Sequence, residues 1–262
     1  MLVSLKDKTA LVCGSSQGIG KAIAIQFAKM DANVILSARS EEKLKETLLE
    51  LHNSGIQIHE IIPADYNNPQ NFIDKVKDYL NSGKKIDILV NNTGGPSAGS
   101  ISEAAPALFI QAFNQHIIMS QLLVQSLIEG MKSRGYGRII NVISISVKQP
   151  IENLGVSNTV RGAMASWSKT LSRELAPHGI TVNNILPGYT KTQRLISLFE
   201  NKANALNRSV DDISMEVLKD IPAARFGESE ELGYLAGFLA SPLSSYITGT
   251  SIPIDGGFIK GL

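Results

Sequence analysis

The chain has 262 residues, with 43% hydrophobic and 19% charged side chains and a formal net charge of +1. This length and composition suit one large domain with a buried core, and the balanced charge gives no sign of a nucleic-acid or membrane-surface partner. The single cysteine, Cys13, cannot form an internal disulfide, which suits a reducing cytoplasm. The N-terminus lacks the apolar core of a signal peptide and the chain has no run of about 18 apolar residues, so we expect a cytoplasmic protein without a membrane span. No metal site is expected.

Short apolar runs alternate with longer amphipathic stretches along the whole chain. The runs predict strands at residues 9–13, 33–38, 56–63, 87–90, 138–143, 181–185 and 251–254. The amphipathic stretches predict helices at residues 21–30, 41–54, 69–81, 107–132 and 155–175. This alternation predicts an α/β fold with a seven-stranded parallel sheet between two layers of helices. No linker divides residues 1–262, so we expect a single domain.

The least regular segment, about residues 190–222, follows the predicted sixth strand. It contains two helical stretches, 195–206 and 210–218. Ligands of parallel α/β sheets bind outside the carboxyl ends of the strands, so an insertion at this place can cover a substrate. We expect a substrate lid, with a plain surface excursion as the alternative.

Three glycines, Gly14, Gly18 and Gly20, follow the first predicted strand and open the first predicted helix. Glycine permits a tight turn and a close approach of the backbone to a pyrophosphate, whose charge the free N–H groups of a helix start can bind. A Walker loop is excluded because Gly20-Lys21 is followed by Ala22 instead of serine or threonine. The glycines therefore predict a dinucleotide site.

The type of dinucleotide is indicated by the end of the predicted second strand. An acidic residue there would bind a ribose 2′-hydroxyl, whereas an arginine accommodates a 2′-phosphate. The sequence Ser37-Ala38-Arg39-Ser40 contains an arginine and no acid, which favours NADP(H) over NAD(H). Gln17, in the glycine loop, supplies no second base for the phosphate, which weakens this prediction, and a solvated surface charge is the alternative role for Arg39.

Further elements occur in a fixed order along the chain. They are Asn91-Asn92-Thr93-Gly94, Pro187-Gly188 with Thr192, Pro222-Ala223-Ala224-Arg225-Phe226-Gly227, and Tyr246-Ile247-Thr248-Gly249 with Ile254-Asp255-Gly256-Gly257. With the glycine loop, they resemble the short-chain dehydrogenase/reductase family over essentially the whole chain, and most nearly its 3-oxoacyl-carrier-protein reductase and sugar dehydrogenase members. The resemblance implies a Rossmann domain that forms a homo-oligomer, a dimer or tetramer, through the helices around 107–132 and 157–175.

The resemblance also implies which residues contact the cofactor. Asp65, after the third predicted strand, looks like the family's adenine-binding aspartate, and Pro187-Gly188 looks like the element that packs on the nicotinamide carboxamide. The implied set is Gly14, Ser16, Gln17, Gly18, Ile19, Gly20, Arg39, Asp65, Tyr66, Asn92, Gly94, Arg161, Pro187, Gly188 and Thr192.

The catalytic positions depart from the family pattern. Carried over by position, the family's serine is Ser144, its tyrosine position holds Ser157, and its lysine position holds Arg161. The position of the family's asparagine holds His116, unless a shift of one helical turn makes Asn114 the equivalent. The resemblance therefore implies catalytic roles at Ser144, Ser157, Arg161 and His116, of which only the first matches the family.

These replacements change the proton chemistry. An aliphatic hydroxyl such as that of Ser157 is far less acidic than a phenol, and Arg161 stays protonated, so neither can relay protons as the family's pair does. His116 titrates near neutral pH and could donate the proton instead, and Tyr189 and Lys148 are further candidates. Packing or surface roles are the ordinary alternative for each of them.

We expect an NADP(H)-dependent oxidoreductase for a carbonyl or alcohol substrate of the 3-oxoacyl or polyol type, with a non-standard active site. The retained Ser144 and the predicted lid favour this interpretation. The alternative is a catalytically impaired relative that binds nucleotide as a sensor or as a subunit of an oligomer. The loss of the tyrosine and lysine favours that alternative.

Overall fold

The computed structural model describes residues 3–261 and contains one sheet of parallel strands. The strands are β1 (Thr9–Cys13), β2 (Asn33–Ser37), β3 (Glu60–Ile61), β4 (Ile88–Asn91), β5 (Gly137–Val142), β6 (Ile180–Pro187) and β7 (Ser251–Ile254). Their order is β3-β2-β1-β4-β5-β6-β7, with parallel pairing throughout. The predicted seven-stranded doubly wound sheet is confirmed, and the order reverses between β1 and β4.

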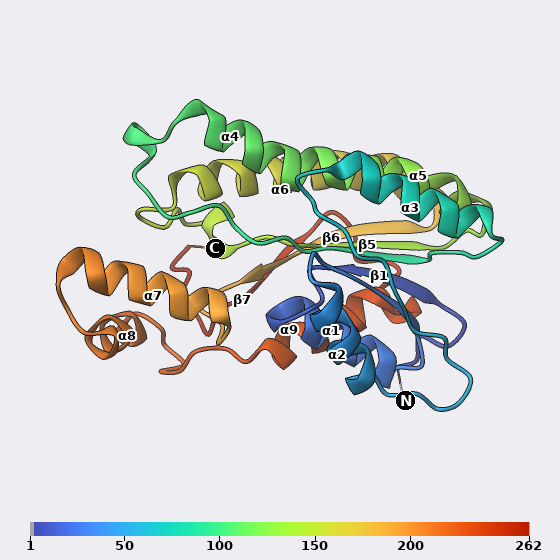
Figure 1. The fold of residues 1–262 in the computed structure, drawn as a ribbon, viewed down its shortest axis with the longest axis horizontal. Helices are drawn as coiled ribbons and strands as arrows, with labels where there is room; N and C mark the ends of the chain where they lie inside the picture. Colours follow the sequence, from blue (N-terminus) through green and yellow to red (C-terminus); the bar gives the residue numbers. More distant parts are fainter. Residues whose placement is uncertain (1–2, 262) are drawn as a thin grey trace.

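Helices cover both faces of the sheet (Figure 1). They are α1 (Gly18–Lys29), α2 (Glu41–Glu50), α3 (Pro69–Asn81), α4 (Pro106–Phe113), α5 (Met119–Ser133), α6 (Gly155–Leu175), α7 (Gln193–Leu206), α8 (Val210–Lys219) and α9 (Ser229–Ala240). In Figure 1, α3, α5 and α6 lie on one face and α1, α2 and α9 on the other, while α7 and α8 project beyond one end of the sheet.

The alternation of side chains along β1 shows how the sheet holds the two layers together. Ala10 and Val12 pack in the cluster that contains α1 and α9, whereas Leu11 and Cys13 pack in the cluster that contains α3 and α5. Successive side chains of a strand point to opposite faces, so a strand covered on both sides must be apolar at every position. That is why β1 reads as an uninterrupted apolar run.

Two predicted elements are shorter in the structure. The helix expected at 41–54 ends at Glu50, because Leu51 turns to an extended conformation and Gln57 binds the Ser54 N–H at 2.7 Å and the Ala28 carbonyl at 2.7 Å. The strand expected at 56–63 pairs only at Glu60–Ile61, since Asn33 accepts the N–H of Ile58 with its side chain. Side-chain hydrogen bonds to the backbone replace regular structure in both segments.

The long helix expected at 107–132 is interrupted. A π-helical turn, η2 (Asn114–Ile118), joins α4 to α5 and contains His116. The whole stretch Pro106–Ser133 is long and apolar enough, by length and composition alone, to cross a membrane. The sheet explains the apolar residues in the second half of this stretch, where Met119, Leu123 and Leu127 are buried in the core, but not those of its first half, where Ile110 and Phe113 are exposed.

Buried asparagines form a hydrogen-bonded row across the strands β4, β5, β6 and β7. Asn91 donates to Asn141 at 2.8 Å, Asn141 donates to Asn184 at 3.1 Å and to Ser168 at 2.9 Å, and Asn184 donates to Ser251 at 3.0 Å. Buried amides are stable only when they are paired, so the row fixes the register of these strands as well as their packing.

We expect Asn141→Ala to lower the free energy of unfolding by about 2–3 kcal/mol, because it removes the acceptor of the buried Asn91 amide and the donor to Asn184 and Ser168. Urea denaturation followed by circular dichroism measures the change. Asn201→Ala, on the exposed surface of α7, is the control and should change stability by less than about 0.5 kcal/mol. Equal stabilities for the two variants would contradict the structural role of the row.

Candidate cofactor and active site

The predicted functional segments meet at one edge of the sheet. The glycine loop follows β1, Asn92 to Gly95 follow β4, Ser144 follows β5, and Gly188 to Thr192 follow β6. Because all strands are parallel, their carboxyl ends lie on the same side, and the change in strand order between β1 and β4 opens a crevice there. The structure therefore brings these segments together as the sequence predicts.

Gly14 and Gly20 allow the glycine loop to turn against the loop after β4. Gly14 has a φ of 61°, and a Cβ on it would lie 2.5 Å from the carbonyl oxygen of Asn92. A Cβ on Gly20 would lie 2.2 Å from the carbonyl oxygen of Gly14. Asn92 ties the two loops together by donating to the carbonyls of Cys13 and Gly14, each at 3.2 Å. No side chain fits at either glycine position.

Two polar side chains hold the glycine loop on the sheet. Buried Ser15 accepts the N–H of Ser37 at 2.9 Å. Tyr66 accepts the N–H of Gly14 and donates to the carbonyl of Ser37, both at 2.9 Å. Burial raises the pKa of Tyr66 well above its usual value and that of Cys13 to about 12, so both stay protonated at neutral pH. Tyr66, predicted as a cofactor contact, is engaged with the backbone of the loop.

Two helices begin beside this loop. Gln17 is the N-cap of α1 and makes no capping hydrogen bond with its side chain, and neither α1 nor α7 has an acidic residue in its first turn. Thr192, the N-cap of α7, comes so close to Gly18 that a Cβ there would lie 3.3 Å from its methyl group. Free N–H groups and the positive end of the helix dipole favour anions. The residues present therefore fit a dinucleotide pyrophosphate.

The residues predicted for the other parts of the cofactor have different surroundings. Arg39 is exposed at the end of β2. Asp65 is exposed and accepts the N–H of Asn67 at 3.0 Å. Gly188 is packed against β7, because a Cβ on it would lie 2.7 Å from the Cα of Asp255. Arg39 is thus free to meet a ligand phosphate, while Gly188 also has a structural reason to be glycine.

Ser144 lies directly after β5 and is partly exposed. Its Oγ accepts the backbone N–H of Ser146 at 3.0 Å. That hydrogen bond uses a lone pair of the hydroxyl and leaves its proton available for donation. Ser144 is therefore held in place with its hydroxyl proton free, at the edge of the sheet formed by the carboxyl ends of the strands.

Ser157 and Arg161 lie one turn apart on α6. Arg161 is buried and donates to the carbonyl of Val142 at 2.9 Å and to that of Thr93 at 3.3 Å, while its Nε has no partner among the described residues. Burial, and then the charge of Arg194, lower its pKa to about 10, so it remains a cation at neutral pH. The guanidinium of Arg161 is therefore a fixed positive charge on α6.

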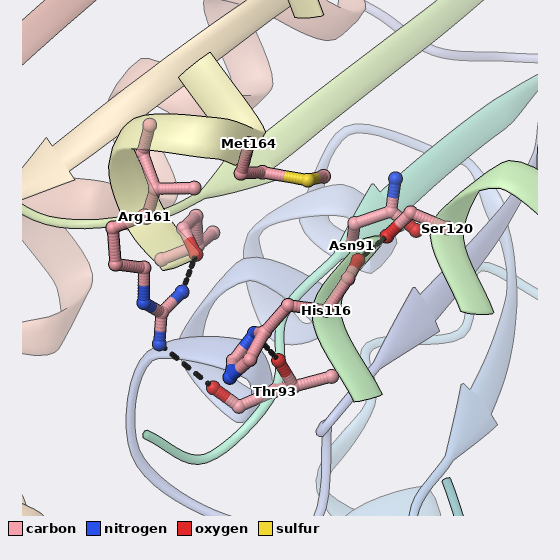
Figure 2. Close-up of a pocket in the computed structure, with 8 residues that line it drawn as sticks. Asn91, Thr93, His116, Ser120, Arg161 and Met164 are labelled. Atoms are coloured by element: carbon pink, nitrogen blue, oxygen red, sulfur yellow. Dashed lines mark hydrogen bonds between the residues drawn. The ribbon is translucent and has the colours of Figure 1, made fainter. Parts of the chain in front are cut away.

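His116 lies beside Arg161 in a small cavity (Figure 2). The cavity is lined by Asn91, Thr93, His116, Ser120, Val142, Ile143, Arg161 and Met164. The Nδ1 of His116 is hydrogen-bonded to the hydroxyl of Thr93. Burial and the charge of Arg161 lower the pKa of His116 well below its usual value, so the imidazole is neutral near pH 7. It can pass a proton on but is not a cationic acid.

The remaining candidate residues lie elsewhere. Asn114, the alternative to His116, is exposed on η2. Tyr189 packs against Phe199 and Phe258, with ring centroids 6.3 and 5.3 Å apart, in the cluster formed by α7 and α8. Lys148 is exposed. No tyrosine is among the residues that line the cavity around Arg161.

Arg194 was not singled out by the sequence. It lies in the first turn of α7, donates to the carbonyl of Pro96 at 2.6 Å, and thereby connects the predicted lid to the loop after β4. A basic residue two positions after Thr192 was the available signal. Its spatial neighbours depend on how α7 folds back over the sheet edge, which no local pattern shows.

The chain is similar to known oxidoreductases over nearly its whole length. Residues 14–259 match the family model described as enoyl-(acyl carrier protein) reductase. The NADPH-dependent reductase BacG of Bacillus subtilis is 31% identical, covering 98% of this chain and 100% of that protein, and the 3-oxoacyl-[acyl-carrier-protein] reductase FabG of Vibrio cholerae is 31% identical, covering 97% and 98%. The crystal structure of L-sorbose reductase from Gluconobacter frateurii with NADPH and L-sorbose aligns with a TM-score of 0.92 at 32% identity, covering 100% of both chains.

Proposed function

This chain belongs to the short-chain dehydrogenase/reductase family, and on that premise we propose that it is an NADPH-dependent reductase of a carbonyl compound. The observation that carries the proposal is the meeting of the glycine loop, the starts of α1 and α7, and the hydroxyl of Ser144 at one edge of the sheet. The substrate classes that fit the relatives are 3-oxoacyl compounds and polyols or sugars.

The cofactor is NADP(H) in preference to NAD(H). The similar reductase BacG is described as NADPH-dependent, the similar L-sorbose reductase was crystallised with NADPH, and the end of β2 in this chain carries Arg39 and no acid. The pyrophosphate would be held by the glycine loop, that is by Gly14, Ser16, Gln17, Gly18, Ile19 and Gly20. The rest of the cofactor would contact Arg39, Asp65, Tyr66, Asn92, Gly94, Arg161, Pro187, Gly188 and Thr192. When bound, the nicotinamide supplies the hydride of the reaction.

We expect Arg39→Ala to weaken NADPH binding by about 10- to 100-fold and NADH binding little, because only NADPH carries the phosphate that a guanidinium binds with charge-assisted hydrogen bonds. Fluorescence titration with both cofactors measures the two affinities. Lys29→Ala, with the same change in charge at the far end of α1, should change neither affinity. An equal loss for NADPH and NADH in Arg39→Ala would refute the phosphate contact.

Reduction adds a hydride to the carbonyl carbon and a proton to its oxygen. Ser144 donates a hydrogen bond to that oxygen, and the fixed charge of Arg161 stabilises the negative charge that develops on it. In this proposal the proton comes from solvent water, and neutral His116 relays it: its Nδ1 is hydrogen-bonded to Thr93, and its Nε2 has no partner among the described residues and is the atom that would take up the proton. The proposal therefore needs no tyrosine, and it gives Ser157 a place in the substrate pocket and no acid–base role.

The segment of residues 190–222 is the lid in this proposal. The helices α7 and α8 share their own apolar cluster, formed by Leu195, Phe199, Ala203, Ile213, Val217 and Ile221, so they can move as a unit. The protein acts in the cytoplasm as a homo-oligomer, a dimer or tetramer. Exposed apolar residues on the helical stretch 106–118, Leu108, Ile110, Phe113 and Ile118, support an interface there.

NADPH oxidation, followed by absorbance against a panel of ketones, 3-oxoacyl thioesters and oxidised sugars, tests the reductase. The proposal expects turnover of at least one carbonyl compound with NADPH preferred to NADH. Tight NADPH binding without any turnover would support the second candidate, a relative that holds nucleotide as a sensor or as a silent subunit. The observation that favours this second candidate is the replacement of the phenol by Ser157.

A further inference from the structure

Two arginines from distant parts of the chain converge beside Gly95. The ideal Cβ position of Gly95 lies 3.6 Å from a terminal nitrogen of Arg194, 3.8 Å from a terminal nitrogen of Arg161 and 3.9 Å from the hydroxyl of Ser157. Arg161 comes from α6 and Arg194 from the first turn of α7. Both charges therefore reach the same side of the loop after β4, next to the predicted substrate pocket.

Neither charge is neutralised by the protein. None of the ion pairs among residues 3–261 includes Arg161 or Arg194. Their hydrogen bonds go to backbone carbonyls, those of Val142 and Thr93 for Arg161 and that of Pro96 for Arg194. Each guanidinium has five N–H donors, so donors on both remain available to a ligand.

The two charges disfavour each other. Burial and the charge of Arg194 lower the pKa of Arg161, and burial lowers that of Arg194, although Arg194 is exposed along part of its length. His116, which also faces Arg161, is neutral and supplies no counter-charge. Two cations that lie side by side without a counter-charge attract an anion that can accept hydrogen bonds from both.

The cofactor pyrophosphate has a different place. The residues that fit it are the glycine loop and the starts of α1 and α7, where Thr192 approaches Gly18. The arginine pair lies beside Gly95 and Ser157 instead, where the family resemblance puts the reacting end of the substrate. The 2′-phosphate is assigned to Arg39 at the end of β2. Arg161 also contributes to the cofactor site and to the charge on the carbonyl oxygen in the proposed reaction, but no anion of the cofactor or the protein is assigned to Arg194, so the substrate is the molecule left to supply one.

We propose that Arg194, together with Arg161, binds a carboxylate of the substrate, so that this enzyme reduces oxo acids in preference to neutral carbonyl compounds. The planar guanidinium matches a carboxylate with two parallel hydrogen bonds, which fixes the orientation of the substrate as well as its charge. This substrate class rests on the proposed reductase activity, and the binding experiment below tests it separately from that activity.

Matched pairs of compounds test the preference. Acetoacetate and its methyl ester differ in charge, as do 5-oxo-D-gluconate and L-sorbose, in which a carboxylate replaces a hydroxymethyl group. The proposal expects kcat/KM for the acid to exceed that for its neutral partner by at least about tenfold in one pair or both. Equal or better turnover of the neutral partner in both pairs would overturn it.

Arg194→Gln should remove that preference. The variant keeps an exposed polar side chain, and we expect a rise of at least about tenfold in KM for the acid with little change for the neutral partner. Lys77→Gln is the control, because it removes one positive charge from the exposed surface of α3, outside the lid. A loss of NADPH affinity in Arg194→Gln, with the acid preference retained, would show that the arginine serves the cofactor and would overturn the proposal.

Gly95→Ala tests the same space without changing a charge. The added methyl group would be in ordinary contact with both guanidinium groups, and Gly95 does not have a positive φ, so the fold should tolerate it. Gly95→Ala should weaken the binding of the acid more than the binding of its neutral partner. Gly99→Ala, in the same loop with open space around its Cβ position, should leave both unchanged.

Calorimetric titration of acetoacetate into the protein saturated with NADP⁺ separates the carboxylate site from the reductase activity. The proposal expects acetoacetate to bind, methyl acetoacetate to bind at least about tenfold more weakly, and Arg194→Gln to remove the difference. Such binding without turnover would reject the reductase and keep the carboxylate site. Turnover of neutral compounds without acetoacetate binding would reject the carboxylate site and keep the reductase.

Discussion

Ser144→Ala should lower kcat by about 100- to 1,000-fold, the loss expected when a donor to a developing oxyanion is removed. The Oγ of Ser144 already accepts the N–H of Ser146 at 3.0 Å, which fixes the position of the oxygen and leaves its proton free for donation. Alanine removes the donor without leaving a buried cavity, because Ser144 is partly exposed. NADPH oxidation with a saturating carbonyl compound measures the change.

The affinity for NADPH should stay nearly the same in Ser144→Ala, since no cofactor contact is assigned to this side chain. Ser146→Ala is the matched control: its hydroxyl has no partner among the described residues, so its loss breaks no hydrogen bond, and the backbone N–H that holds Ser144 remains. A parallel loss of turnover and NADPH affinity in Ser144→Ala, or no loss at all, would remove Ser144 from the mechanism.

Gly20→Ala should abolish NADPH binding, with a loss of at least about 100-fold, and lower the free energy of unfolding by about 1–3 kcal/mol. Its Cβ would lie 2.2 Å from the carbonyl oxygen of Gly14 and 2.6 Å from the side-chain nitrogen of Asn92. These are atoms of the glycine loop and of the loop after β4, and both would have to move apart. The start of α1 would then no longer face the pyrophosphate.

Gly162→Ala is the control for that substitution. Gly162 lies inside α6 with nothing within 4 Å of its Cβ position, so alanine should raise the free energy of unfolding by about 0.5–1 kcal/mol through helix propensity. Fluorescence titration with NADPH and urea denaturation give both quantities. A Gly20→Ala variant that binds NADPH as tightly as the original chain would show that the close contact at Gly20 does not shape the site.

Local sequence patterns were sufficient for most of the fold. The helix Pro69–Asn81 was predicted with its observed bounds, because Pro69 sits in its first turn and Asn68 caps it with a side-chain hydrogen bond. The helix at 41–54 was predicted too long because Gln57 donates to the carbonyls of Ala28 and Ala32, which are far from it in sequence. The π-helical turn at His116 gives no signal in an apolar helical pattern, since it adds one residue to a turn without changing its composition.

The candidate site was predictable where a residue acts through its own backbone or its neighbours in sequence. The glycines of the first loop and Ser144 after β5 belong to this group. Tyr66 accepts the N–H of Gly14, a residue 52 positions away in the sequence. Arg194, in the first turn of α7, approaches Gly95 in the loop after β4. Such contacts follow from the packing of the whole domain and are visible only in the structure.

The most direct measurement of the central claim uses NADPH carrying deuterium at C4 of the nicotinamide. The deuterated cofactor is mixed with the purified protein and the carbonyl panel, and the products are analysed by mass spectrometry and NMR. A reductase of this family transfers the label to the former carbonyl carbon of a product alcohol, and the transfer falls in Ser144→Ala. The experiment uses equal concentrations of protein and cofactor. Tight binding of the deuterated cofactor with no label in any product would then contradict the reductase and identify a nucleotide-binding relative without hydride chemistry.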